Sequence, residues 1–334
     1  MKVVITGVGG FLGSHLADSF ISARWQVTGI DNFLGGYKDN VPDQVDLFEI
    51  DLLDLELLKE PFANADLVIH TACTAYEGLS VFSPSLIVAN TVQATTNALT
   101  ASIQNNVKKF VYLSSMARYG DKKGDLFTED MTPNPQDPYG IAKYASELLV
   151  KNLCETHGVD WVILVPHNII GPRQKYDDPY RNVASIFINR MLQGKQPIIY
   201  GKGESLRCFS FIQDVINPLM VACEFPDAVG QIINIGPDEE HLSIYDLAVK
   251  VAEIMEFDLY PIFMPGRPQE VLIALCSSDK ARNLLGYKTG TDLGDGLRQL
   301  VDYIKGRGVK PFDYHLPLEI VSDKTPKTWS QRLM

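Results

Sequence analysis

The stretch that decides the fold lies near the start of the chain and reads Lys2-Val3-Val4-Ile5-Thr6-Gly7-Val8-Gly9-Gly10-Phe11-Leu12-Gly13. Its β-branched run predicts a buried strand over residues 2–6, and the apolar pattern of residues 11–23 predicts a helix directly after the glycines. Glycines at positions 7, 10 and 13 permit a tight turn, close approach of the backbone to a diphosphate, and close packing of helix on strand. Glycines also serve ordinary turns, but the strand–turn–helix context predicts a dinucleotide-binding unit with the diphosphate at the helix N-terminus.

Asp31 stands at the end of the next predicted strand, residues 26–31, and 18 positions after Gly13. A carboxylate there accepts hydrogen bonds from the hydroxyls of an adenosine ribose and repels a 2′-phosphate. The position therefore favours NAD over NADP. A solvated turn aspartate is the alternative interpretation.

Short apolar runs alternate with helix-like stretches over the first half of the chain. Strands are predicted over residues 2–6, 26–31, 46–51, 66–72, 110–115 and 161–166, and helices over residues 11–23, 52–62, 86–105 and 139–157. Strands that are apolar almost throughout are covered on both faces, so the pattern predicts an α/β fold with a doubly wound parallel sheet. After residue 171 the predicted strands become shorter. Residues 311–334 form a proline-punctuated tail that either wraps the surface or frays.

The composition excludes several classes of protein. With 30 basic and 41 acidic residues the net charge is −11, which argues against a general binder of nucleic acids or anionic membranes. The five cysteines form no CxxC and the six histidines no HExxH, so neither a disulfide framework nor a metal site is predicted. Neither a signal-peptide core nor an apolar run of membrane-spanning length is found. These features predict a cytoplasmic protein.

Tyr139 and Lys143 are four positions apart in a predicted helix, so their side chains share one face. A neighbouring ammonium group and an oxidised nicotinamide both stabilise a phenolate, and they lower the tyrosine pKa from about 10 toward neutrality. Tyr139 would then be a usable general base. Such a spacing also arises by chance, so the helix entry at Pro135-Gln136-Asp137-Pro138 is needed to support it. Ser114 and Ser115 end the preceding strand and either hold a substrate oxygen or serve as turn residues.

Several segments form a specific combination: Thr6-Gly7-x-x-Gly10-x-x-Gly13, Asp31, Asp51-Leu52, His70-Thr71-Ala72, Ser115-Met116-Ala117-Arg118-Tyr119-Gly120, Tyr139-x-x-x-Lys143 and Pro166-His167-Asn168-Ile169-Ile170-Gly171-Pro172-Arg173. Together they resemble the extended short-chain dehydrogenase/reductase family and, within it, the nucleotide-sugar epimerase/dehydratase branch. The resemblance implies an NAD-binding Rossmann domain over residues 1–170, with some later segments crossing back into it. It also implies a smaller α/β sugar-nucleotide-binding domain over residues 171–310, followed by the tail.

The resemblance implies a role for each matched residue. Tyr139 would be the catalytic base, Lys143 would hold the nicotinamide ribose and lower the pKa of Tyr139, and Ser115 would be the catalytic hydroxyl. The substrate would be bound by Ser115, Tyr139, Asn168, Arg207 and Arg267, the last three on its diphosphate. Other contacts to NAD are expected from Gly7, Gly10, Phe11, Leu12, Gly13, Asp31, Asn32, Asp51, Leu52, Thr71, Ala72, Cys73, Asn90, Ser114 and Pro166.

Departures from the family pattern narrow the expected reaction. Met116 and Ala117 stand where related 4,6-dehydratases carry an Asp-Glu pair. Related decarboxylases usually carry a glutamate at the second position, and 3,5-epimerase/reductases a cysteine at the first. Neither methionine nor alanine can transfer a proton, so one acid/base, one hydroxyl and NAD remain. This set favours a nucleotide-diphospho-sugar 4-epimerase acting through a 4-keto sugar; a 4-dehydrogenase or 4-ketosugar reductase, and a non-catalytic NAD-sensing regulator, are the alternatives.

Specificity and assembly are less defined by the sequence. The loop of residues 176–182 is expected near the nucleotide base, where Tyr176 and Tyr180 either stack on the base or pack within the loop. Arg118 occupies a position that is usually small and apolar in the family, and it either reaches the sugar or faces solvent. The resemblance implies a homodimer, for which the helices predicted at residues 86–105 and 139–157 are candidates.

Overall fold

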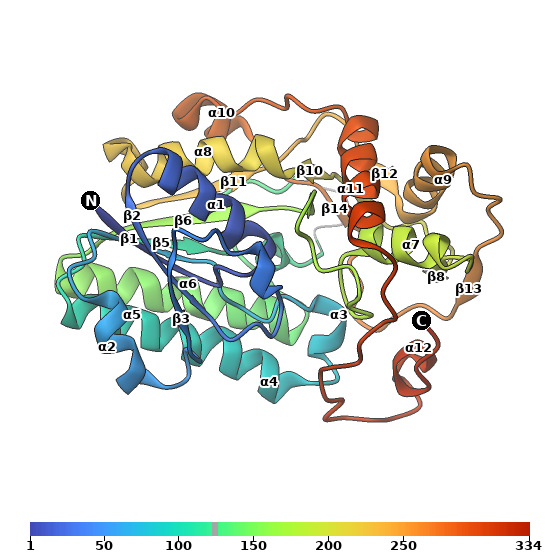
Figure 1. Cartoon of the computed structure of the whole chain (residues 1–334), viewed down its shortest axis with the longest axis horizontal. Helices are drawn as coiled ribbons and strands as arrows, with labels where there is room; N and C mark the ends of the chain where they lie inside the picture. The colour runs from blue at the N-terminus through green and yellow to red at the C-terminus, as the bar shows by residue number, and fades with distance from the viewer. Residues whose placement is uncertain (122–125) are drawn as a thin grey trace.

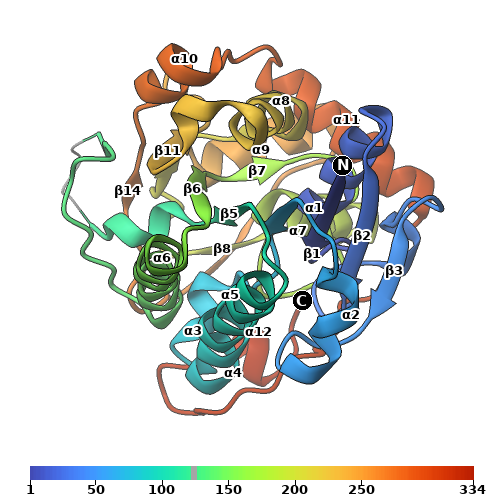
Figure 2. The ribbon, with the colours of Figure 1, turned by 90° about the vertical axis from the view of Figure 1, so that its left-hand side faces the viewer.

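The computed structural model of the chain describes residues 1–121 and 126–334. In these residues a seven-stranded parallel sheet has the order β11-β6-β5-β4-β1-β2-β3. Figure 1 shows the sheet between its helices, and in Figure 2 its edge strands β11 and β3 lie on opposite sides of the molecule. Its strands are β1 (Lys2–Thr6), β2 (Gln26–Asp31), β3 (Asp46–Glu49), β4 (Leu67–His70), β5 (Lys109–Leu113), β6 (Asp160–Pro166) and β11 (Gln231–Ile235). The predicted doubly wound parallel sheet is therefore confirmed.

Helices cover both faces of this sheet (Figure 1). Successive side chains of a strand point to opposite faces, so Val3 and Ile5 of β1 enter one core and Val4 enters the other. The first core lies under α1 (Phe11–Ser22) and α8 (Ile212–Glu224), and the second under α5 (Ala94–Gln104) and α6 (Pro138–His157). Because both faces are apolar, the carboxyl ends of the strands are left as the place where polar side chains gather.

A smaller part of the molecule lies beside those carboxyl ends (Figure 1). It contains α7 (Val183–Leu192), α9 (Ile244–Met255) and α11 (Leu293–Arg307), while α10 (Asp279–Leu285) packs beside β11. Its short strands pair as β7 (Ile169–Ile170) with β10 (Ser210–Phe211), β8 (Ile198–Tyr200) with β13 (Ile262–Met264), and β9 (Leu206–Arg207) with both β12 (Leu242–Ser243) and β14 (Ile273–Ala274).

Two of the predicted helices differ from regular α-helices. Residues 86–105 form α4 (Pro84–Val88), a π-helical turn (Ala89–Gln93) and α5. Such turns insert one residue and are frequent at functional sites, and this one contains Asn90, which borders the cleft described below. Residues 52–62 form a 3-10 turn (Leu55–Leu58) and the single-turn α2 (Lys59–Phe62). The prediction was too long here because Leu53 and Leu57 are exposed and do not belong to a buried helical face.

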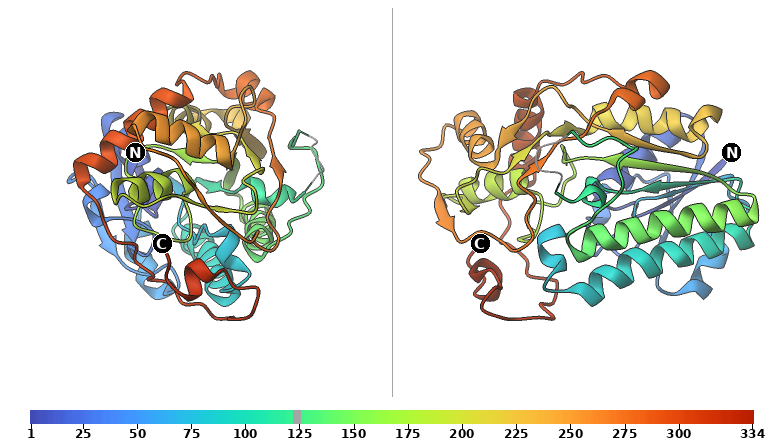
Figure 3. Two further views of the ribbon diagram at one scale, coloured as in Figure 1. Left: turned by 90° about the vertical axis from the view of Figure 1, so that its right-hand side faces the viewer. Right: turned by 180° about the vertical axis from the view of Figure 1, so that it is seen from behind.

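The C-terminal tail (residues 311–334) wraps the molecule, which is one of its two predicted alternatives. It runs past α3 (Glu77–Ser80) and ends after the short helix α12 (Lys327–Ser330), at the bottom of both views in Figure 3. Leu316 and Trp329 are 4% and 2% exposed and join a small core with Tyr76 and Tyr180. The Trp329 indole N–H donates to the Pro179 carbonyl at 3.1 Å. The tail is thus held by a core of its own.

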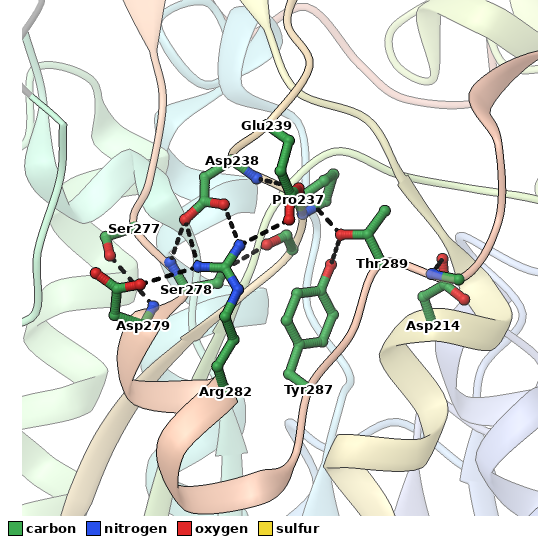
Figure 4. A network of polar contacts seen from close by, with 12 residues as sticks. Asp214, Pro237, Asp238, Glu239, Ser277, Ser278, Asp279, Arg282, Tyr287 and Thr289 are labelled. Atoms are coloured by element: carbon green, nitrogen blue, oxygen red, sulfur yellow. Dashed lines mark hydrogen bonds and ion pairs between the residues drawn. The ribbon is translucent and has the colours of Figure 1, made fainter.

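A polar network joins the loop after β11 to α10 (Figure 4). Arg282 donates to Asp238 at 3.0 Å, to Glu239 at 2.8 Å and to Asp279 at 3.0 Å. Burial acts to raise the pKa of Asp238, but the hydrogen bonds from Arg282 and from the Ser278 amide outweigh it, and the pKa is lowered. These residues border neither of the clefts described below, so the network stabilises this corner of the fold.

Other features of the described residues bear on what the protein can bind. Among them, no helix combines the length and the apolar character needed to cross a membrane. They also contain no group of three or more His, Cys, Asp or Glu side chains arranged to hold a metal ion. All five cysteines are free, and of these Cys73 is the one that is partly exposed.

Candidate active site

The glycine loop between β1 and α1 forms one end of a cleft of about 350 Å³, here named the cofactor cleft. A Cβ atom on Gly13 would lie 2.2 Å from the Gly7 carbonyl oxygen, so helix and loop approach too closely for any side chain. Gly10 caps α1 without a side-chain hydrogen bond, which leaves the first amides of the helix free. Free amides and the positive end of the helix dipole suit a diphosphate. The loop therefore fits the predicted dinucleotide.

Asp31 lies at the end of β2 and borders this cleft. Its carboxylate accepts hydrogen bonds from the Phe33 amide at 2.7 Å and the Gly9 amide at 2.8 Å, and the residue is 9% exposed. Burial raises its pKa, and these backbone hydrogen bonds oppose the increase. Asp31 is thus a fixed acceptor in the wall of the cleft and is not a solvated turn residue.

The structure brings all the predicted NAD contacts together in this one cleft. Its lining includes Gly7, Gly10, Phe11, Leu12, Gly13, Asp31, Asn32, Asp51, Leu52, Thr71, Ala72, Cys73, Asn90, Ser114, Ser115, Tyr139, Lys143 and Pro166. They come from the carboxyl ends of several strands and from the helices that follow. This is the position at which parallel sheets bind ligands.

Tyr139 and Lys143 lie on the first turns of α6 and face the end of β5. The Lys143 ammonium donates to the Leu113 carbonyl at 2.7 Å and lies 6.0 Å from the centre of the Tyr139 ring. Ser115 is the second residue after β5, and its hydroxyl accepts the Ala117 amide at 3.2 Å. Lys143 and Tyr139 are 2% and 8% exposed, so both are held rigidly. The last carbonyl of β5 thereby fixes the ammonium beside the phenol.

The pKa of Tyr139 in the protein alone is governed by burial. Burial raises the pKa of its phenol well above 10, and the nearby Cys73 adds to the increase, while Lys143 and a hydrogen bond with Ser115 act in the opposite direction. The expected decrease toward neutrality includes the charge of the oxidised nicotinamide, and in the protein without it burial outweighs Lys143. The physical reason is desolvation of the phenolate, which one buried ammonium does not compensate. The positive charge of the nicotinamide is the remaining contribution that favours the phenolate.

Arg118 takes neither of its two predicted positions. Its side chain is 3% exposed and pairs with Glu147 of α6 through Nε and Oε1, 2.9 Å apart. Ser114 donates its hydroxyl to the same carboxylate. Glu147 lies one turn beyond Lys143, so this buried pair ties the segment after β5 to the helix that carries Tyr139. Arg118 is a structural partner of the site and lines neither cleft.

Asp137 caps the N-terminus of α6. Its carboxylate accepts the Gly140 amide at 2.9 Å and the Ser80 hydroxyl at 3.3 Å. Burial, together with repulsion from Glu77, raises the pKa of Asp137 to about 7. The helix that carries Tyr139 is therefore capped by a carboxyl group whose pKa lies near neutrality.

A second pocket of about 270 Å³, here named the adjoining pocket, opens from the cofactor cleft. The two share Ala75, Glu77, Asn168, Ile169, Arg181 and Asn182. Of the predicted substrate contacts, Arg207 and Arg267 line the adjoining pocket, whereas Ser115 and Tyr139 line the cofactor cleft. Arg267 pairs with Glu270 at 3.0 Å, and Arg207 donates to the Val271 carbonyl at 2.7 Å. Both arginines are held inside a pocket and not in surface salt bridges.

Glu77 and Arg181 lie in segments expected near the ligand but were not predicted as site residues, although both line the two clefts where they meet. The Arg181 guanidinium lies 4.9 Å from the Tyr76 ring centre and donates to the Gly35 carbonyl at 3.2 Å, and its buried Nε has no partner in the described residues. Arg181 could have been predicted as a site residue, because it is a charged residue in the loop of residues 176–182, which was expected near the nucleotide base. Tyr176 is fully buried and lines neither cleft, which supports packing for that residue, whereas Tyr180 borders the adjoining pocket.

Comparison with known proteins agrees with this geometry. The model of the NAD dependent epimerase/dehydratase family matches residues 3–236. A UDP-glucose 4-epimerase from Thermotoga maritima, solved with UDP-glucose, is 30% identical with a TM-score of 0.86 over 92% of this chain and 99% of its own. A UDP-glucuronic acid 4-epimerase from Bacillus cereus, solved with UDP-glucuronic acid and NAD, is 30% identical with a TM-score of 0.84 over 92% and 100%. A UDP-N-acetyl-alpha-D-glucosaminuronate decarboxylase from Bacillus cytotoxicus is 30% identical over 76% of this chain and 80% of its own.

The match to the family model includes the whole cofactor cleft, from the glycine loop to Pro166, and reaches β11 at the edge of the sheet. The close helix–loop contact at Gly13 and the uncapped start of α1 fit a dinucleotide diphosphate, and the cofactor is NAD. This chain is a nucleotide-sugar enzyme of the NAD-dependent epimerase/dehydratase family.

Proposed function

We propose that the protein is a nucleotide-diphospho-sugar 4-epimerase. The observation that supports this most is the junction of the two clefts. Tyr139 and Lys143 border the cofactor cleft, and the arginines Arg207 and Arg267 border the pocket that opens from it. A sugar whose diphosphate lies at the arginines can extend toward the phenol and the nicotinamide.

Each residue near the junction has a distinct task in this reaction. Tyr139 removes the proton of the sugar hydroxyl at C4, and the Lys143 ammonium stabilises the phenolate that accepts it. Ser115 donates a hydrogen bond to the sugar oxygen while it becomes a ketone. NAD, when bound, would supply a reversible hydride acceptor for C4, and the 4-keto sugar must turn over in the pocket for C4 to be reduced on its opposite face. Tyr139 then gives its proton back, so the enzyme is unchanged after each turnover and needs no second substrate.

A decarboxylase is the second candidate, because one relative at 30% identity is a decarboxylase. The residues after Ser115 argue against it. Ala117 stands where related decarboxylases carry a glutamate, and Met116 offers no proton either. The described junction instead contains Glu77, whose carboxylate comes from α3 and not from the segment after β5.

The test follows the products directly. The purified protein is incubated with UDP-, GDP-, CDP- and dTDP-hexoses and hexuronic acids, and NMR follows the sugar while absorbance follows NADH. The proposal predicts a C4 epimer without accumulation of NADH. Accumulating NADH would identify a dehydrogenase, and loss of carbon dioxide to give a pentose would identify a decarboxylase.

A matched pair of variants tests the base. Tyr139→Phe should lower kcat by about 10²- to 10⁴-fold, the usual contribution of general acid–base catalysis. Tyr144 lies on the same helix, is only partly buried and lines neither cleft. Tyr144→Phe should therefore leave kcat unchanged. Equal activity of both variants would contradict the assigned mechanism.

We propose two further points about organisation. The NAD-binding domain comprises residues 1–170, with β11 and α8 returning to it, and residues 171–310 form the sugar-nucleotide domain. A homodimer through α4, α5 and α6 is supported by Ile141 and Leu148, which are 53% and 49% exposed, seven positions apart on α6. Sedimentation equilibrium of the protein and of Leu148→Lys tests this assembly.

A further inference from the structure

The short helix α12 of the C-terminal tail lies directly behind one wall of the adjoining pocket. Thr328 and Trp329 are 0% and 2% exposed, but neither lines the pocket itself. They contact residues that do, which are Tyr200, Gly78 and Tyr180. Through these contacts α12 can influence the position of Arg267, which also lines the pocket.

Thr328 supports one side of Arg267. The Thr328 and Tyr200 hydroxyls share a hydrogen bond, and the Tyr200 ring lies under the Arg267 guanidinium, whose central carbon is 4.6 Å from the ring centre. The Thr328 carbonyl also accepts the Tyr314 hydroxyl at 3.1 Å, which fixes the helix from its other side. The orientation of the aromatic ring beneath the guanidinium is therefore set from the tail.

Trp329 lies close to Arg267 at a second place, beside Gly78. A Cβ atom on Gly78 would lie 3.1 Å from Nη1 of Arg267 and 3.3 Å from Cη2 of Trp329, so both side chains pack against the same face of this glycine. Trp329 is itself fixed by its hydrogen bond to the Pro179 carbonyl and by edge contact with the Tyr180 ring, whose centre is 5.5 Å away. The ring of Trp329 thus limits how far α3 and Arg267 can move.

We propose that Thr328 and Trp329 are positioning residues for Arg267, and that the C-terminal tail is in this way part of the substrate site. The inference rests on the proposed function, in which Arg267 binds the diphosphate of the nucleotide sugar. A free arginine side chain loses much rotamer freedom when it binds a phosphate, and this loss weakens binding. Arg267, packed against Tyr200 and Gly78 and paired with Glu270, has lost that freedom before the substrate arrives.

The test compares variants by calorimetric binding of UDP, GDP, CDP and dTDP, by kinetics and by NAD content. Thr328→Val and Tyr200→Phe each remove the shared hydrogen bond and should weaken binding of the preferred nucleotide diphosphate about 3- to 10-fold. KM for the nucleotide sugar should rise by the same factor, whereas kcat and bound NAD stay within twofold. Thr328→Ser keeps the hydroxyl and should restore wild-type binding. Ser330→Ala, at an exposed position of the same helix, is the matched control and should match wild type.

Arg267→Ala is the reference that separates this inference from the proposed function. If Arg267→Ala does not weaken binding, Arg267 has no role on the diphosphate, and that part of the proposed function fails together with the inference. If it weakens binding but Thr328→Val, Tyr200→Phe and Trp329→Phe bind like wild type, the inference alone fails. Thr328→Val in the Arg267→Ala background should cause no further loss, because both act on one group. A parallel loss of kcat, bound NAD and melting temperature would show a merely structural tail and would also overturn the inference.

Discussion

Replacing Arg118 with leucine should strongly destabilise the protein, because it leaves the Glu147 carboxylate buried without its ion-pair partner. The two side chains are 3% and 0% exposed, so water cannot replace the lost guanidinium. Removing one member of a buried pair costs about 3–5 kcal/mol. For a chain of this length each kcal/mol corresponds to about 2 °C, so the melting temperature should fall by about 6–10 °C.

The protein contains a matched control for this experiment. Arg298 and Asp295 form an ion pair of 2.5 Å, but their side chains are 60% and 64% exposed. Exposed pairs contribute less than about 1 kcal/mol, so Arg298→Leu should change the melting temperature by 2 °C at most. Urea titrations of both variants give the free energies of unfolding. The double variant Arg118→Leu/Glu147→Leu should recover part of the loss, because it removes the unpaired charge.

The single variant Arg118→Leu should also have a lower kcat than wild type. Glu147 binds both Arg118 and the Ser114 hydroxyl, so the pair aligns the segment containing Ser115 with the helix of Tyr139. Loosening this alignment changes the position of two reacting groups, and small errors in position are costly in catalysis. The reasoning is refuted if Arg118→Leu is no more destabilising than Arg298→Leu.

Three further predictions concern the cofactor and pH. Gly13→Ala places a Cβ 2.2 Å from the Gly7 carbonyl oxygen, so the variant should purify without NAD, measured by absorbance after denaturation. Burial raises the pKa of Asp137 from 3.8 to about 7. The protonated carboxyl therefore stabilises the folded protein at low pH, and this contribution is lost as the pH rises through 7. In urea titrations between pH 5 and pH 8, Asp137→Asn should lose less stability than wild type. The pKa of Asp238 is lowered despite burial, because Arg282 binds its carboxylate. The stabilisation from this pair is therefore lost as the pH falls below 3.8, the ordinary pKa of an aspartate. In an acid titration followed by circular dichroism, Arg282→Ala should unfold at a higher pH than wild type.

Local signals in the sequence predicted most of the cofactor cleft. The bounds of β1 and β2 are as predicted, because a β-branched run followed by closely spaced glycines allows few alternatives. The pairing of Tyr139 with Lys143 was predictable for the same reason. Side chains four positions apart on one helix lie on the same face, and this does not depend on the rest of the chain. In both cases a few neighbouring residues determine the geometry.

The adjoining pocket was less predictable because its parts meet over long distances in the chain. The strands β9 and β14 each have two residues and pair across more than sixty positions, so they show no period to detect. Arg118 was misjudged for a related reason, since its partner Glu147 lies on another element. The helix α12 has four residues and is held by contacts with Tyr200 and Pro179, which sequence patterns do not reveal.

The cofactor cleft and the adjoining pocket are connected by continuous chain at one place and by side-chain packing at another. On one side a short run of chain passes directly from one cleft to the other: Pro166 borders the cofactor cleft, and Asn168 borders both clefts. Asn168 has a φ of +43°, a conformation that asparagine tolerates better than most residues, so this link is short and constrained. On the other side α3 is held against Arg267 by packing of Trp329 on Gly78, without a covalent link. Substitutions in the tail can therefore alter the width of the adjoining pocket while the distance from Tyr139 to the nicotinamide stays fixed, so substrate preference should change there before the chemistry does.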